Sequence, residues 1–189
     1  MKELHQQGPV PDAITFAGNG EPTIHPDFPA ILEDTRQLRD TWFPDTPIGV
    51  LSNASMLHRK DVMEALRKSE LNMLKLDAGT EETFRLINRP PGRLSLGQLI
   101  DQMKSFNGGL IIQSMFLRGT ADGVRVDNTT DEEVEAWARC LEAIKPQYVM
   151  IYSIDRDTPL EKLEKVPFDD LLAIGARAEM AGIPAKVYG

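Results

Sequence analysis

The sequence contains a single cysteine, Cys140, among its 189 residues. One thiol cannot form an internal disulfide, and such sparse cysteine is typical of a reducing compartment, so we expect a cytoplasmic protein. One thiolate also cannot hold an iron–sulfur cluster, which needs several cysteine ligands. The three histidines, His5, His25 and His58, lack the spacing of a metal site, so we expect no metal ligands in this sequence.

Long apolar runs and an excess of basic residues are also missing. The longest apolar run, near residues 110–117, is far shorter than the roughly 20 residues that cross a bilayer. Residues 1–10 lack the apolar centre of a signal peptide. Lys and Arg number 21 against 29 Asp and Glu, a net charge of −8. This balance argues against a membrane partner and against indiscriminate binding to nucleic acid, although a tRNA substrate stays open.

The sequence does contain a repeating order of apolar run, polar cluster and helical stretch. The expected strands span residues 13–17, 48–51, 71–76, 110–117, 148–151 and 185–188. Strands that alternate with helices predict parallel βα units. Because the connections are short, we expect an α/β fold with a partial TIM-like (β/α)6 barrel in one domain, residues 1–189. In such barrels the functional groups lie at the carboxyl ends of the strands, so the polar clusters there are candidate site residues.

Helix starts are marked by polar residues. Ser95 with Gln98, and Thr130 with Glu133, have the spacing of capping boxes. Helices are expected over about 26–42 and 60–68, and a shorter one from Glu81. Residues 118–130 are polar and rich in Gly and Asp, which predicts a long surface loop.

The most specific motif is Gly18-Asn19-Gly20-Glu21-Pro22, followed by Thr-Ile-His-Pro. Glycines let the backbone approach a ligand closely, and a carboxylate beside strand-end carbonyls accepts hydrogen bonds from an ammonium group. The motif resembles the Gly-Gly-Glu-Pro element of radical SAM enzymes, which implies that it binds the amino group of S-adenosylmethionine. The alternative is a tight turn in which Glu21 is solvated and Pro22 ends the strand. His25 is expected to orient this turn.

Two further strand ends resemble the same family. Ser52 and Asn53 match a position that lies near the methionine carboxylate or the ribose; the alternative is a helix cap. Lys75 and Asp77 are two residues apart and so share one face of a strand. The resemblance implies that Asp77 binds ribose hydroxyls or orders the methionine end, and that Lys75 meets a carboxylate. The alternative is that Asp77 caps the next helix.

The last two strands supply the remaining candidates. Gln113 lies inside an apolar strand, where an unpaired amide costs about 1–3 kcal/mol. The resemblance implies a ribose partner, and the alternative is a Ser or Asp on a neighbouring strand. Tyr152 and Ile154 resemble the family's adenine wall, and the alternative places both in the core beside an Asp155–Arg156 salt bridge. The cofactor-binding candidates, expected at one mouth of the barrel, are Gly18, Asn19, Gly20, Glu21, Pro22, Ser52, Asn53, Asp77, Gln113, Tyr152 and Ile154.

The resemblance covers about residues 14–188 but lacks the family's C-x3-C-x2-C loop. In the family this loop follows a strand that precedes the Gly-Glu-Pro strand, and residues 1–8 resemble the end of the helix between them. We therefore expect a radical SAM core whose first strand is missing, through truncation or natural loss. The strand that ends at Gly18 would then be an open edge, which favours association.

The resemblance implies the S-adenosylmethionine-binding portion of a radical SAM iron–sulfur oxidoreductase. The full-length enzyme would use S-adenosylmethionine and a 4Fe–4S cluster to form a 5′-deoxyadenosyl radical, and this chain alone would be inactive. Its substrate is unknown. The motifs look most like an iron–sulfur oxidoreductase branch related to tRNA wyosine-forming enzymes, followed by activating enzymes of glycyl-radical enzymes such as pyruvate formate-lyase. The alternatives are a cluster-free SAM-binding regulator or scaffold, and a TIM-like hydrolase or aldolase that uses Glu21 and Asp77.

Overall fold

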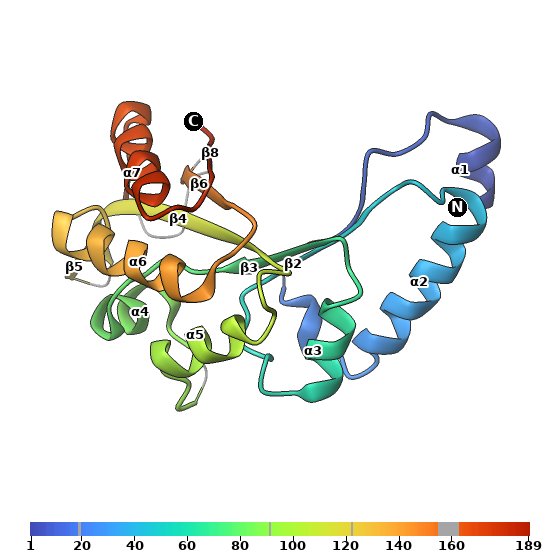
Figure 1. Ribbon diagram of the computed structural model, residues 1–189, viewed down its shortest axis with the longest axis horizontal. Helices are drawn as coiled ribbons and strands as arrows, with labels where there is room; N and C mark the ends of the chain where they lie inside the picture. The colour runs from blue at the N-terminus through green and yellow to red at the C-terminus, as the bar shows by residue number, and fades with distance from the viewer. Residues whose placement is uncertain (19, 91, 122, 155–162) are drawn as a thin grey trace. The chain divides into compact units, whose positions relative to one another are not determined.

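The computed structural model describes residues 1–18, 20–90, 92–121, 123–154 and 163–189. The chain divides into two compact units, Met1–Leu74 and Lys75–Gly189. Each unit is described by itself, with the elements labelled as in Figure 1. The extent of a single domain over residues 1–189 stays a prediction.

The first unit is built on three parallel strands in the order β1, β2, β3. Its elements are α1 (Lys2–Gln7), β1 (Ile14–Phe16), the 3₁₀ turn η1 (Pro22–Ile24), α2 (Phe28–Trp42), β2 (Ile48–Ser52), α3 (Lys60–Leu66) and β3 (Leu71–Lys75, whose last residue belongs to the second unit). Both strand pairs are parallel, with Ile14 opposite Ile48 and Gly49 opposite Leu71. Among the described residues, β1 pairs with β2 alone.

The middle strand of this unit is largely buried, as parallel strands covered by helices usually are. On one face of β2, Ile48 and Val50 have no exposed surface, and on the other face Gly49 is buried and Leu51 is half-buried. The buried Arg39 of α2 is fully used: it donates to the Thr46 carbonyl at 2.7 Å and to the Glu70 carboxylate at 3.1 Å. Glu70 in turn accepts from the Ile48 amide at 2.9 Å. Glu70, directly before β3, therefore connects the end of α2 to the start of β2.

The second unit combines a parallel sheet with an antiparallel extension. Its elements are α4 (Glu81–Asn88), α5 (Leu96–Lys104), β4 (Ile111–Ala121), β5 (Val124–Asp127), α6 (Asp131–Ile144), β6 (Val149–Ser153), β7 (Leu163–Lys165), α7 (Phe168–Met180) and β8 (Ala185–Val187). Strand β6 lies between β4 and β8 and is parallel to both, whereas β5 and β7 run antiparallel to β4. Helix α6 packs against both α5 and α7.

The predicted fold class is confirmed. All six predicted strands form, as β1, β2, β3, β4, β6 and β8, and helices follow them as the apolar periodicity indicates. The sheet is open, because among the described residues β1 pairs with β2 alone and β8 with β6 alone. The barrel is therefore partial, and β1 is an edge strand as expected.

The surface loop predicted over residues 118–130 is wrong. Strand β4 continues to Ala121 and the chain returns as β5, with Arg118 opposite Asp127 and Gly119 opposite Val126. Val126 is buried and packs with Leu117. The polar composition obscured this hairpin, although Asp-Gly at positions 122–123 is a hairpin signal.

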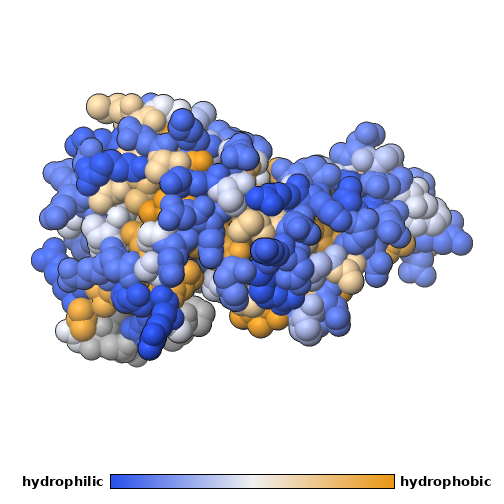
Figure 2. Space-filling view, turned by 60° about the horizontal axis from the view of Figure 1, so that its bottom comes forward, coloured by the Kyte–Doolittle hydropathy of each residue, from blue (hydrophilic) through white to orange (hydrophobic). Residues whose placement is uncertain are grey.

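The surface in the view of Figure 2 is mostly hydrophilic, and its hydrophobic residues lie in separate small patches. Within the described ranges, no helix has both the length and the apolar character needed to cross a membrane.

Helix α6 is anchored by the carboxylate of Glu133. The capping box at Ser95 and Gln98 is complete, but the one at Thr130 is only half formed. Thr130 accepts from the Glu133 amide at 3.3 Å, while the Glu133 carboxylate reaches the turn after β3 instead. There it accepts from the amides of Gly79 and Thr80 and from the hydroxyls of Thr80 and Thr83. The expected return bond of Glu133 is wrong, because its buried carboxylate accepts from these four half-buried donors instead.

Gly79 is required at this contact because α6 passes directly over it. A Cβ on Gly79 would lie 2.1 Å from the backbone nitrogen of Trp137. Replacing Gly79 by Ala should lower the free energy of unfolding by about 1–3 kcal/mol, the usual cost of overpacking, measured by urea denaturation. The matched control is Gly97→Ala in α5, where a methyl group meets nothing within 4 Å. It should raise stability by roughly 0.5–1 kcal/mol, and equal stability of the two variants would contradict the contact.

Candidate functional site

In the first unit, Glu21 joins the carboxyl ends of β1 and β2. Its Oε1 accepts from the Thr23 amide at 3.1 Å, from the Thr23 hydroxyl, and from the Ser52 hydroxyl at 2.8 Å. Its Oε2 accepts from the Asn53 amide at 2.6 Å. Glu21 is half-buried and hydrogen-bonded, so the alternative of a solvated carboxylate is wrong. Oε2 keeps acceptor capacity, since a carboxylate oxygen has two lone-pair directions.

The residues around Glu21 differ in what they leave available. The Ser52 hydroxyl is buried and is used twice, because it also accepts from the Ala54 amide at 3.0 Å. Asn53 is exposed and its Oδ1 accepts from the Ser55 amide, while its Nδ2 bonds to no described residue. Arg59 is the N-cap of α3, so the helix-cap alternative for Ser52 and Asn53 is wrong.

The glycine-rich turn itself is open. A Cβ on Gly18 or Gly20 would meet no atom within 4 Å, and Pro22 begins η1 directly after Glu21. The ring Nδ1 of His25 accepts from the Asp27 amide at 3.1 Å, which orients the turn as expected. Asn19 lies outside the described residues.

In the second unit, Asp77 is a buried carboxylate with every oxygen in use. Oδ1 accepts from the Met115 amide at 2.9 Å, and Oδ2 accepts from Asn88 Nδ2 at 2.9 Å and pairs with Lys75 Nζ at 3.2 Å. Burial raises the pKa of Asp77, and the Lys75 charge opposes that shift. Thr80, not Asp77, is the N-cap of α4, so the helix-cap alternative is wrong. Lys75 and Asp77 lie on one face as their spacing predicts, and there they pair with each other.

Beside Asp77, one face of the β4–β6 sheet is only half covered. Gln113 lies opposite Met150, and Met115 opposite Tyr152, and all four side chains are half-buried. The other face is closed, since Ser114 is buried and accepts from the Trp137 indole at 2.9 Å. The half-covered face is therefore the one on which a ligand could lie within this unit.

Two polar groups on that face lack strong partners. Gln113 Nε2 donates only to Met150 Sδ, at 3.9 Å, so the alternative of a neighbouring Ser or Asp partner is wrong for the described residues. The Tyr152 hydroxyl makes no hydrogen bond to any described residue. Burial, with the nearby Asp77 charge adding to it, raises the pKa of Tyr152 to about 12. Both groups can still donate to a ligand.

Ile154 has the surroundings of a core residue. It is half-buried and packs against the cluster of Leu117 and Val126, as Met115 of the half-covered face also does. Asp155 and Arg156, the alternative salt bridge of this strand end, lie outside the described residues.

Two asparagines near Asp77 carry no sequence signal and were not predicted. Asn128 is fully buried; its Nδ2 donates to the carbonyls of Asp77 and Met115, both at 2.8 Å, and its Oδ1 accepts from the Leu117 amide. Asn88 ends α4 and reaches Asp77 across eleven positions. Only the fold brings these residues to the site.

The described residues hold no cluster of three or more His, Cys, Asp and Glu side chains that would bind a metal ion. Cys140 is buried against the Gly79 carbonyl at 3.7 Å, and burial raises the pKa of its thiol to about 11. Cys140 is therefore a packing residue of the core, with its thiol held away from solvent.

The candidate residues fall into two groups. Glu21, Ser52 and Asn53 meet in the first unit, and Lys75, Asp77, Gln113 and Tyr152 meet in the second. That both groups line one mouth of a barrel stays a prediction.

Comparison with known proteins finds the same fold in radical SAM enzymes. A domain of pyruvate-formate lyase-activating enzyme from Bacteroides vulgatus has a TM-score of 0.68 and 17% identity. The match covers 95% of this chain and all of that domain. A radical SAM methyltransferase from Sphaerobacter thermophilus has a TM-score of 0.70 and 18% identity. The match covers 99% of this chain and 53% of the methyltransferase chain. Streptococcus suis SuiB, solved with S-adenosylmethionine bound, has a TM-score of 0.67 and 17% identity. The match covers 100% of this chain and 41% of the SuiB chain. At these identities the likeness establishes the fold alone.

Sequence comparison adds relatives that are longer than this chain. A UPF0026 protein of Synechocystis is 30% identical over 167 residues, which is 86% of this chain and 58% of that protein. One from Methanocaldococcus jannaschii is 29% identical over 160 residues, 82% of this chain and 46% of that protein. A protein named GTPase Obg from Brachyspira hyodysenteriae is 26% identical over 164 residues, 85% of this chain and 22% of that protein. The chain thus spans between a fifth and three fifths of these relatives. No family model matches it.

The raised pKa of Tyr152 predicts a loss of stability at alkaline pH. Above the ordinary tyrosine pKa of about 10, the unfolded chain releases the Tyr152 proton while the folded chain keeps it to about pH 12. The free energy of unfolding should therefore fall through this window. An absorbance titration should lose its most alkaline phenol step in Tyr152→Phe and keep it in the control Tyr188→Phe. Loss of that step in the control alone would contradict the assignment.

Proposed function

We propose that this chain is the S-adenosylmethionine-binding portion of a radical SAM iron–sulfur oxidoreductase. The observation that carries the proposal is the contact between the Gly-x-Gly-Glu-Pro turn and the end of β2, through Glu21, Ser52 and the Asn53 amide. This contact lies at the carboxyl ends of two parallel strands, where proteins of this architecture bind ligands. The likeness in fold to radical SAM enzymes supports the same assignment.

In the first unit, Glu21 is the acceptor for the methionine ammonium group. Its Oε1 is held by Thr23 and Ser52, which leaves Oε2 with one internal donor, the Asn53 amide. The Nδ2 group of Asn53 is the donor for a carboxylate or a ribose hydroxyl. Ser52 then acts on the ligand only through Glu21, because its own hydroxyl is buried and doubly used.

In the second unit, the half-covered face offers hydrogen-bond donors to the nucleoside. Gln113 and Tyr152 are the donors without strong internal partners, and Met115 and Met150 between them supply an apolar surface. Asp77 keeps Lys75 in place through their ion pair rather than meeting the ligand, since its side chain is 0% exposed.

The cluster ligands must come from polypeptide outside these 189 residues. Cys140 is the single cysteine, and its neutral buried thiol does not fit a cluster ligand. A bound 4Fe–4S cluster would supply the electron that cleaves S-adenosylmethionine to methionine and a 5′-deoxyadenosyl radical. The residues described above bind and orient S-adenosylmethionine for that reaction.

The substrate class is proposed only coarsely. The motifs favour an iron–sulfur oxidoreductase branch related to tRNA wyosine-forming enzymes, with an activating enzyme of a glycyl-radical enzyme next. A macromolecular substrate in the cytoplasm fits both. The acidic balance of the chain disfavours tRNA without excluding it.

The hydrolase or aldolase alternative is less well supported. A general acid or base must reach the substrate, and both oxygens of Asp77 are buried and hydrogen-bonded. The regulator or scaffold alternative uses the same binding residues and differs only in the absence of a cluster from the full-length protein.

Binding of S-adenosylmethionine to this chain tests the site. Calorimetry should show weak saturable binding and a preference for adenosyl ligands over guanosine. Glu21→Gln and Gln113→Ala should each weaken binding roughly tenfold, the effect of losing one ligand hydrogen bond. The matched controls are the exposed Glu179→Gln and Gln147→Ala, which should bind like the parent chain. Equal affinity of all four variants would contradict the site.

Anaerobic reconstitution with iron and sulfide tests the cluster argument. This chain should retain far less iron than the about four atoms of one cluster and should form no 5′-deoxyadenosine. A longer version that carries an in-frame C-x3-C-x2-C before Met1 should gain both. Stoichiometric iron in the 189-residue chain, or an upstream region without such cysteines, would contradict the enzyme proposal while leaving SAM binding intact.

A further inference from the structure

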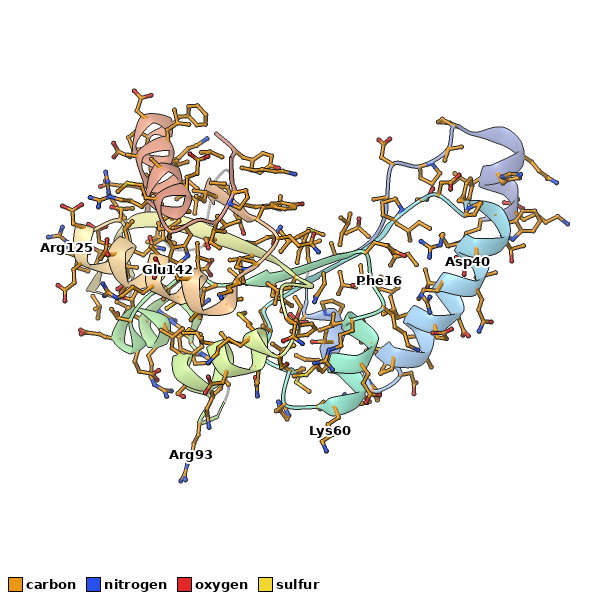
Figure 3. The ribbon with its side chains drawn as sticks, viewed as in Figure 1. Phe16, Asp40, Lys60, Arg93, Arg125 and Glu142 are labelled. Carbon is orange, nitrogen blue, oxygen red and sulfur yellow. The ribbon has the colours of Figure 1, made fainter. Side chains whose placement is uncertain are left out.

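Helices α6 and α7 of the second unit pack against each other (Figure 1), and a pocket of about 220 Å³ lies between them. Asp170, Ile174 and Arg177 line the pocket from α7, where residues three, four and seven apart share one helix face. On α6 the lining comes from the first turn, at the opposite end of the helix from Glu142, which Figure 3 labels.

The pocket lies within the row of helices of this unit and not at an end of the row. Helix α6 directly precedes β6 and α7 is followed directly by β8, and α6 packs against α5 as well. Further strand–helix units, such as the one expected before β1, would pair beside β1 or β8 and extend the row at its ends. They would therefore leave the space between α6 and α7 open.

The guanidinium group of Arg177 is held only loosely at this pocket. Its nitrogens lie 3.7 Å from Asp131 Oδ1 and 3.9 Å from Glu135 Oε2, which is beyond hydrogen-bond distance. The Arg177 side chain thus donates no hydrogen bond to any residue in the described ranges. Its planar fork of N–H groups is therefore available to bind a carboxylate through two parallel hydrogen bonds.

At the start of α7, the Asp170 carboxylate can accept a further hydrogen bond. Its Oδ2 pairs with Arg118 Nη2 at 2.9 Å, and Arg118 is fixed by the bond from its Nε to the Thr129 hydroxyl at 2.6 Å. A carboxylate has about four lone-pair sites, so Oδ1 of Asp170 can accept from an ammonium group. Because long side chains lean toward the N-terminus of their helix, Arg177 extends along its face of α7 toward Asp170.

The charge, surface and size of the pocket indicate what it would hold. Two arginines balance two aspartates in the lining, so it favours a zwitterion over a free anion. Val134 and Ile174 are each 5% exposed and add an apolar surface. A cavity of about 150 Å³ binds benzene, with its six heavy atoms, so about 220 Å³ suits a molecule of about nine.

We propose that this pocket binds a free α-amino acid with an apolar side chain of about the size of leucine. The carboxylate of the amino acid pairs with Arg177, and its ammonium group donates to Asp170. Its side chain lies against Val134 and Ile174.

This pocket is separate from the half-covered face of the sheet. Along β4, Arg118 shares its face with Ser114, because side chains alternate between the two faces of a strand. Ser114 accepts from the Trp137 indole of α6, so this face is the one that the helices cover. Gln113 is on the other face, and the proposal does not depend on S-adenosylmethionine binding.

Calorimetric titration of the purified chain with leucine tests the proposal. Binding should be saturable. Leucine amide, which lacks the carboxylate, and N-acetylleucine, which lacks the ammonium group, should each bind at least about tenfold more weakly, since each loses a charge-assisted hydrogen bond. Arg177→Gln and Asp170→Asn should weaken leucine binding by about the same factor.

Two matched controls should bind leucine like the parent chain. Arg139→Gln removes an arginine that also pairs loosely with Glu135, at 3.6 Å, but does not line the pocket. Asp169→Asn removes an exposed carboxylate from the same turn of α7 as Asp170. Because the side chains of Arg177 and Asp170 are 47% and 43% exposed, their variants should fold normally.

Three results would overturn the proposal. The first is no saturable binding of leucine, or equal affinity of the Arg177 and Arg139 variants for it. The second is inorganic phosphate that displaces leucine, because the pocket would then be a plain anion site. The third is leucine binding that Glu21→Gln abolishes and Arg177→Gln does not, which would assign leucine to the proposed S-adenosylmethionine site instead.

Discussion

The second unit depends on one buried carboxylate, that of Glu133. It collects four hydrogen bonds from residues 79–83, the turn that directly follows Asp77. A buried carboxylate is costly unless its lone pairs are satisfied, so the turn can adopt few other conformations while α6 is folded. The same turn must contain glycine at position 79 because the α6 backbone passes over it. The position of Asp77 in the sheet is therefore set from a helix more than fifty residues later in the chain.

Asp77 extends this constraint into the half-covered face. Its carboxylate is held by Met115 and Asn88, its carbonyl accepts from Asn128, and its charge fixes Lys75 at 3.2 Å. A carboxylate this deeply buried is costly to leave without its partners. The donors on the neighbouring strands thus lie on a rigid support, which is what a binding site for a small ligand needs.

Sequence reasoning predicted the parallel strands because their apolar runs are local and strong. Its candidates Glu21, Ser52 and Lys75 each follow or end such a run, and Glu21 and Ser52 contact each other, whereas their role in binding stays a prediction. It missed the β4–β5 hairpin, whose exposed residues read as a loop, and β7, which is only three residues long. Glu133 was taken for a local capping residue, but four donors far away in the sequence outweigh one bond to the Thr130 backbone. Asn88 and Asn128 could not be found, because their partners become neighbours only in the folded chain.

Cys140 gives this arrangement an internal reporter. Its sulfur lies on the same α6 face as Glu133, 3.7 Å from the Gly79 carbonyl, and is shielded from solvent in the folded state. A thiol-reactive reagent can reach it only after α6 has separated from the turn, and no other thiol in the chain competes for the reagent. The rate at which the reagent modifies the unaltered protein therefore measures how often the contact between α6 and the turn opens. A ligand that binds on the Asp77 side of the turn would slow this modification, and the decrease in rate would depend on its affinity for the closed form.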